Sequence, residues 1–102
     1  MLFLILLQYR VPTGEVDRHL EEHRSYLQRH YAAGHFLLSG PQEPRTGGAI
    51  LAIAGSRDEV AQWVSEDPFQ RANVADYTIV AWKPTLRDPM IPAALAPDAR
   101  EP

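Results

Sequence analysis

The chain has 102 residues, a length that predicts one domain rather than two. Its 13 acidic residues outnumber its 10 basic ones, and this balance argues against nucleic acid or an anionic membrane surface as a partner. The absence of cysteine excludes disulfides, thiolate nucleophiles and cysteine-ligated metal centres. It also fits a reducing compartment, so we expect a cytoplasmic protein.

The chain opens with an apolar run that resembles a signal peptide, but no basic residues precede it and no small-residue cleavage site follows it. No window approaches the roughly 20 apolar residues of a membrane span, so we expect a soluble protein. We interpret residues 2–9 as a strand. Because the run is almost continuously apolar, a central strand with cover on both faces is predicted.

A helix is expected next, over residues 15–33. Its first residues are acidic, and Gly34, which tolerates a left-handed cap, follows it. Residues 35–38 predict a second strand that ends at Ser39-Gly40-Pro41. Residues 49–54 predict a third strand after a polar loop over residues 42–48, so the two strands are expected to form a hairpin.

The second half of the chain predicts one more helix and one more strand. Ser56 and Glu59 have the spacing of a capping box, which predicts a helix over residues 57–65. A short helical turn to residue 72 and a strand over residues 76–83 follow. Residues 85–102 hold four prolines and four alanines without periodicity. We expect them to form an extended or disordered tail, unless a partner subunit orders it. The folded domain is then expected to consist of residues 1–84.

The predicted order of elements is βαββαβ, the ferredoxin-like α+β pattern of an antiparallel sheet with both helices on one face. The other face of the sheet would then be bare, although the first strand is apolar on both sides. A second copy of the same sheet could cover it, so we expect a homodimer of the dimeric αβ-barrel type.

His23 lies within the apolar stripe of the first helix, where its ring is expected to face the core. A buried imidazole needs a hydrogen-bond partner, because an unpaired polar group costs roughly 1–3 kcal/mol. The candidate partner is Asp67, which follows a predicted helix C-terminus, where the helix dipole disfavours negative charge. We therefore expect the two side chains to pair. The stripe consists of Val16, Leu20, His23, Leu27 and Tyr31.

Both residues also have plain structural interpretations. A histidine bonded to a backbone carbonyl would account for His23, and Asp-Pro is an ordinary way to open a turn. Residues 19–23 match a His-x-x-Glu-His zinc pattern, but no third ligand motif and no room for a peptidase cleft are evident, so we expect no metal site. His30 and His35 are expected to interact with carbonyls at the helix end.

Four further positions are candidates for substrate binding. The backbone of Gly40, next to Pro41, could line the mouth of a pocket, because glycine permits close approach. Ser39 and Tyr26 carry hydroxyl groups that could orient a substrate oxygen.

These residues together resemble the YciI-like (YCII-related) proteins. The resemblance rests on His23, the glycine eleven residues later, Ser39-Gly40-Pro41 and Asp67-Pro68-Phe69, and it covers residues 1–84. It implies a homodimeric ferredoxin-like domain with a histidine and an aspartate as its catalytic centre, here His23 and Asp67. It also adds Phe69 to the substrate-binding candidates. The chain departs from the family pattern in its short loop after Gly40-Pro41 and in its tail.

One branch of that family is similar to dehydrochlorinases that remove HCl from chlorinated hydroxyhydroquinones. The resemblance therefore implies an enzyme that needs a proton acceptor and no redox cofactor. We expect His23 to act as general base or acid on a small cyclic substrate, in an elimination or isomerisation, while Asp67 fixes its tautomer. The alternatives are a non-catalytic small-ligand-binding module and a cofactorless monooxygenase. A nucleophilic hydrolase is disfavoured, since no serine lies in a nucleophile elbow.

Overall fold

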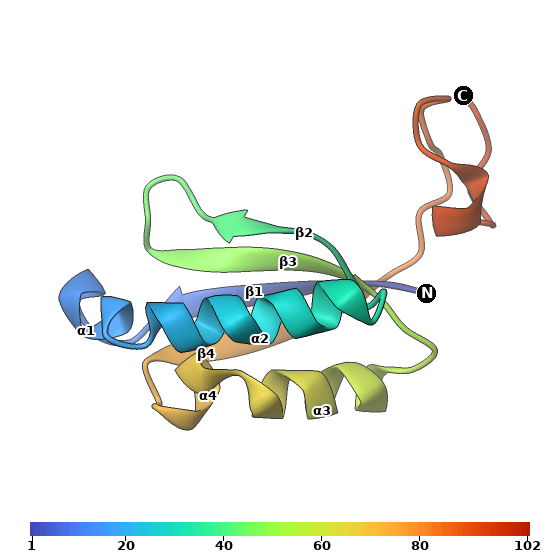
Figure 1. Ribbon diagram of the computed structural model, residues 1–102. Coiled ribbons are helices and arrows are strands. Elements are labelled where there is room, and N and C mark those ends of the chain that lie inside the picture. Colours follow the sequence, from blue (N-terminus) through green and yellow to red (C-terminus); the bar gives the residue numbers. More distant parts are fainter.

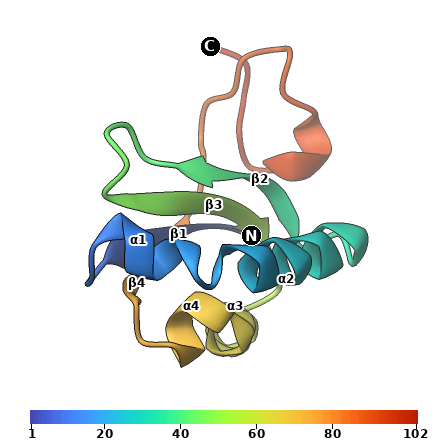
Figure 2. The same ribbon diagram turned by 60° about the vertical axis from the view of Figure 1, so that its left-hand side comes forward.

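A computed structural model describes all 102 residues and shows a four-stranded antiparallel sheet with its helices on one face (Figures 1 and 2). The strand order is β2-β3-β1-β4, which is the ferredoxin-like arrangement. The predicted fold class is therefore confirmed. The strands are β1 (Leu2–Tyr9), β2 (Phe36–Pro41), β3 (Gly47–Ile53) and β4 (Ala75–Trp82). The helices are α1 (Thr13–Asp17), α2 (Leu20–Ala32), α3 (Arg57–Glu66) and α4 (Pro68–Arg71).

Strand β1 is central, as predicted, and its two faces have different surroundings. Ile5 pairs with Ile50 of β3 on one side and with Ile79 of β4 on the other. Its side chain is fully buried under the helices. Leu6 points to the opposite face and is 37% exposed. Cover on both faces of β1, as the sequence suggested, is therefore not provided by this chain alone.

Helix α3 follows the sequence prediction closely. The Ser56 side chain accepts a hydrogen bond from the Glu59 backbone N–H at 3.3 Å, which satisfies one otherwise unpaired donor of the first turn. The apolar stripe of the helix, consisting of Val60, Trp63 and Val64, is buried against the sheet. These contacts fix the end of α3, from which Asp67 emerges.

The prediction of one continuous helix over residues 15–33 is wrong, because the structure has two helices there. The chain leaves the helix at Arg18 and His19, so that α1 and α2 are separate. The buried face of α2 also differs from the predicted stripe. His23, Tyr26 and His30 are buried, whereas Tyr31, assigned to the stripe from sequence, is 39% exposed.

Strand β2 continues beyond its predicted end at residue 38. Ser39 pairs with Ile50 of β3, and Pro41 pairs with Gly48. Because β2 is an edge strand, a proline without an N–H group can be accommodated there. The loop between β2 and β3 is therefore residues 42–46, shorter than the predicted loop.

The tail is not extended, contrary to the prediction. Leu86 forms a parallel bridge with Arg100, and the Arg100 N–H donates to the carbonyl oxygen of Thr85 at 3.0 Å. Ala96 and Ala99 are buried by this fold-back. A short 3-10 helix, η1 (Ala93–Leu95), lies within it, and the tail lies on the side of the sheet away from the helices (Figure 2). Its backbone groups pair within the tail, which a composition argument cannot detect.

None of the helices combines the length and the apolar character needed to span a membrane.

Candidate active site

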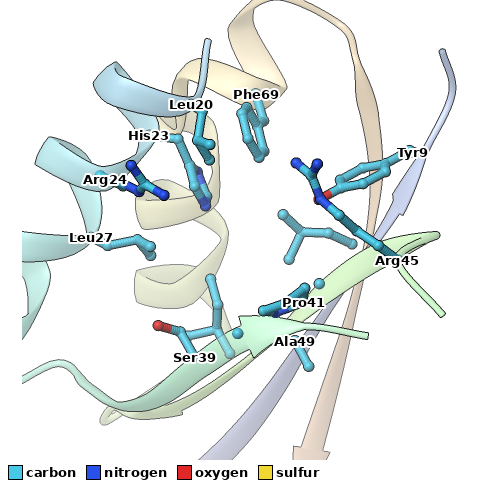
Figure 3. A pocket seen from close by; sticks show the side chains of 14 residues that line it. Tyr9, Leu20, His23, Arg24, Leu27, Ser39, Pro41, Arg45, Ala49 and Phe69 are labelled. Atoms are coloured by element: carbon cyan, nitrogen blue, oxygen red, sulfur yellow. The ribbon is translucent and has the colours of Figure 1, made fainter. Parts of the chain in front are cut away.

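A cavity of about 380 Å³ lies on the helix-covered side of the sheet (Figure 3). Helix α2 supplies His23 to its wall, α4 supplies Phe69, and β2 supplies Ser39, Gly40 and Pro41. The remaining wall is largely aliphatic. The cavity therefore brings together the predicted histidine and four of the five predicted binding residues. The aliphatic lining residues are Leu7, Leu20, Leu27, Ala49 and Ile50.

His23 and Asp67 lie in contact, although 44 residues separate them in the sequence. The His23 Nδ1 is 2.7 Å from Oδ1 of Asp67, and the aspartate is fully buried. A carboxylate can only accept, so Nδ1 carries the proton and the lone pair of a neutral ring is on Nε2. His23 Nε2 makes no hydrogen bond in the protein, and the one buried side-chain nitrogen or oxygen without a partner is Nε of Arg87. Nε2 is therefore accessible from the cavity.

The Asp67 carboxylate accepts three hydrogen bonds. Oδ1 also accepts from the backbone N–H of Phe69 at 3.0 Å, and Oδ2 accepts from the hydroxyl of Tyr77. Burial and the neighbouring Asp67 charge raise the pKa of Tyr77, so the phenol stays protonated and donates. The three donors come from α2, α4 and β4 and fix the orientation of the carboxylate.

The expectation that Asp67 stands against local preference needs a correction. Asp67 ends α3, but it is also the N-cap of α4, with Pro68 at the first helical position. Aspartate at an N-cap and proline directly after it are both favoured there. Its position is therefore locally favourable, and the buried partners explain the residue better than the dipole of α3 does.

Phe69 lies flat against His23. The ring centroids are 3.9 Å apart and the planes differ by 4°. Because the Phe69 backbone also binds Asp67, the short helix α4 supports both the imidazole and its partner. This stacking restricts the orientation of the ring and keeps Nε2 directed at the cavity.

Tyr26 does not reach the cavity, contrary to the prediction. Its hydroxyl donates to the backbone carbonyl of Trp63 at 2.7 Å, and the residue is 1% exposed. Burial raises the pKa of Tyr26. Tyr26 lies three residues after His23 on the buried face of α2, and its bond to Trp63 joins α2 to α3. Ser39 does line the cavity, with its Oγ 2.8 Å from the hydroxyl of Tyr31.

His30 and His35 form a separate cluster, with side-chain partners rather than the predicted carbonyls. Their Nδ1 atoms are 2.9 Å apart, and His30 Nε2 is 3.0 Å from Oε1 of Glu66. The His35 ring stacks on Trp63 with 3.9 Å between centroids. Burial lowers the pKa of His30. Neither histidine lines the cavity.

Four polar residues of the site were missed at the sequence level: Tyr9, Arg24, Arg45 and Tyr77. Tyr77 carried a usable signal, because the alternation of β4 places it on the helix-covered face with Ala75. The sequence carried no comparable signal for Arg24, which lies on a helix surface, or for Arg45, which lies in a loop. No group of three or more histidine, aspartate or glutamate side chains is arranged to hold a metal ion.

The chain matches the YCII-related domain over residues 1–83. It belongs to the YCII-related domain family. It is 35% identical over 77 residues to a xenovulene A biosynthesis cluster protein, asL2, of Sarocladium schorii, which covers 64% of this chain and 67% of the relative. It is 31% identical over 67 residues to the uncharacterized protein YjpA of Bacillus subtilis, which covers 66% and 79%.

A solved structure of this fold is 5-chloro-2-hydroxyhydroquinone dehydrochlorinase (TftG) from Burkholderia phenoliruptrix, in complex with 2,5-dihydroxybenzoquinone. It superposes with a TM-score of 0.72 and 28% sequence identity, over 82% of this YCII-related chain and 95% of that one. The resemblance inferred from the sequence is thus confirmed, and the likeness to TftG supports a small enzyme.

Proposed function

We propose that this chain is a small enzyme in which His23 transfers a proton to and from a cyclic substrate. The observation that carries the proposal is the asymmetry of the imidazole: Nδ1 is bound to the buried carboxylate of Asp67 at 2.7 Å, whereas Nε2 is free toward the cavity. A histidine arranged in this way can act as a general base through Nε2, and the carboxylate stabilises the imidazolium that forms. General acid-base catalysis of this kind contributes about 10²- to 10⁴-fold.

The proposed reaction is an elimination. Nε2 of His23 takes a proton from the substrate, the electron pair of that bond forms a new double bond in the substrate, and a leaving group departs with its own electron pair. The proton on the imidazolium then passes to solvent or to the leaving group. In an isomerisation no leaving group departs: the electron pair shifts within the substrate, and the proton returns to another atom of the same substrate.

The substrate we propose is a planar, oxygen-substituted six-membered ring. The cavity of about 380 Å³ falls within the usual range of small-molecule sites. The face of Phe69 and the side chains of Leu20 and Leu27 offer apolar walls to a flat ring. TftG, which shares the fold, holds 2,5-dihydroxybenzoquinone, and this supports a ring of that size here.

We further propose that the enzyme is a homodimer. The face of the sheet without helices carries exposed apolar side chains from three strands, including Leu6 (37%), Leu38 (67%) and Trp82 (46%). Their joint burial against the same face of a second copy would remove them from water. Burial of apolar surface contributes about 25 cal/mol for each Å², and this gain would help to offset the cost of association.

The test of the catalytic proposal is chloride release from 5-chloro-2-hydroxyhydroquinone. The His23→Gln variant keeps a polar side chain of similar size but removes the base, so turnover is expected to fall by about 10²-fold or more. His19→Gln is the matched control, because His19 precedes α2 and lies outside the cavity. The melting temperature of each variant reports folding.

A folded His23→Gln protein that releases chloride at the rate of the unmodified protein would remove His23 from the chemistry. Binding of 2,5-dihydroxybenzoquinone without any chloride release by the unmodified protein would favour a ligand-binding module instead.

A further inference from the structure

Besides Ser39, the cavity has three polar residues with no part in the proposed proton transfer: Tyr9, Arg24 and Arg45. Figure 3 shows Arg24 beside His23, and Arg45 together with Tyr9 on the opposite side of the cavity. The two guanidinium groups therefore approach the same space as Nε2 of His23 from different directions. With Asp67 sealed behind the His23 ring, no carboxylate lines this space.

Arg45 is held in place by two contacts. Its Nη2 is 2.6 Å from Oδ1 of Asp17, and its guanidinium carbon lies 5.5 Å from the centroid of the Tyr9 ring. These contacts join the loop between β2 and β3 to α1 and to β1. A guanidinium has five N–H donors, so a single bond to Asp17 leaves donors free for a ligand.

Arg24 differs from Arg45 because it makes no ion pair and no hydrogen bond through its side chain. It follows His23 directly in α2 and lies at the edge of the cavity. Its charge is therefore not tied up in a direct bond, although it acts together with Arg45 to lower the pKa of the Asp17 carboxyl.

We infer that the cavity selects rings that carry an ionised oxygen, an enolate or phenolate, and that Arg45 binds this oxygen on the side opposite His23. The inference rests on the proposed function and names the substrate class of the same site. As Nε2 takes a proton from such a ring, electron density moves onto the ring oxygens. A fixed cation facing one of these oxygens stabilises that change more than it stabilises the starting anion. Arg24 adds a second positive charge, held by no ion pair or hydrogen bond, at the edge of the cavity.

The experiment compares two ligands that share a ring. 2,5-Dihydroxybenzoquinone is an acidic enol that is ionised at neutral pH, whereas its dimethyl ether, 2,5-dimethoxybenzoquinone, is uncharged. Each is titrated calorimetrically into the unmodified protein and into Arg45→Gln, Arg24→Gln and Arg29→Gln. Arg29→Gln is the matched control, because Arg29 is an exposed arginine of the same helix outside the cavity.

We expect the unmodified protein to prefer the ionised quinone, and Arg45→Gln to bind it about tenfold or more weakly, the usual effect of losing a hydrogen bond to a charged group. Arg24→Gln is expected to show a smaller loss that disappears in high salt. The ether should bind equally to all four proteins.

Equal weakening of both ligands in Arg45→Gln would show that Arg45 shapes the cavity without recognising charge, and this would overturn the inference. An unmodified protein that prefers the ether, or that binds neither ligand, would also overturn it. These readouts involve no turnover. The selectivity can therefore fail while chloride release depends on His23, and the proton transfer can fail while the selectivity is observed.

Discussion

The hydroxyl of Tyr77 donates a hydrogen bond to Oδ2 of Asp67. Removing this hydroxyl tests the contribution of that one bond to the stability of the protein. In Tyr77→Phe the aromatic ring remains, so no large cavity forms. Oδ2 loses its donor inside a residue that is 0% exposed, where water cannot replace the bond. Hydrogen bonds to charged groups contribute about 1.5–3 kcal/mol, and this sets the expected loss of unfolding free energy. For a domain of about 100 residues, each kcal/mol lowers the melting temperature by about 4–8 °C, so we expect a decrease on the order of 10 °C.

The matched control is Tyr31→Phe. The Tyr31 hydroxyl lies 2.8 Å from Oγ of Ser39, but the residue is 39% exposed and water can replace the bond. Its loss is expected to change the stability by no more than about 0.5 kcal/mol. Both variants are measured by thermal and urea unfolding at one protein concentration, because dimerisation would make stability depend on concentration.

Equal stability of Tyr77→Phe and Tyr31→Phe would refute the reasoning. In that case the Tyr77 hydroxyl contributes nothing to holding the carboxylate, and Asp67 would depend on His23 and the Phe69 backbone alone. The expected result, in contrast, identifies Tyr77 as the third support of the carboxylate.

Further outcomes follow from other parts of the structure. Burial lowers the pKa of His30, so on acidification the unfolded chain takes up a proton before the folded one does. The free energy of unfolding should therefore fall as the pH decreases below about 6.5. His30→Gln should reduce this pH dependence in urea titrations. Gly47→Ala should unfold the protein or displace β3, since its Cβ would lie 1.8 Å from the carbonyl oxygen of Leu7, whereas Gly40→Ala, with nothing within 4 Å, should melt normally. Sedimentation equilibrium should give a dimer, and Leu6→Glu should give a monomer by placing a charge on the exposed sheet face.

Local patterns in the sequence determined the elements of this protein. The apolar run of residues 2–9, the capping box at Ser56 and the glycine after α2 are signals that neighbouring residues carry by themselves. Each of them is consistent with the order βαββαβ, and that order admits few folds. Pairing of His23 with Asp67 could be anticipated because a titratable ring on a buried helix face needs a partner.

The tertiary structure alone decided the details of the site. Tyr26 is buried against α3 and bonded to the carbonyl of Trp63, a contact between two helices that the sequence does not show. The position of Arg45 at the cavity depends on its bond to Asp17, which is 28 residues away in the sequence. Tyr77 reaches Asp67 from a different strand. Contacts of this kind depend on the packing of elements, and sequence periodicity describes each element separately. For the same reason the fold-back of the tail, which pairs Leu86 with Arg100, could not be derived from its proline and alanine content.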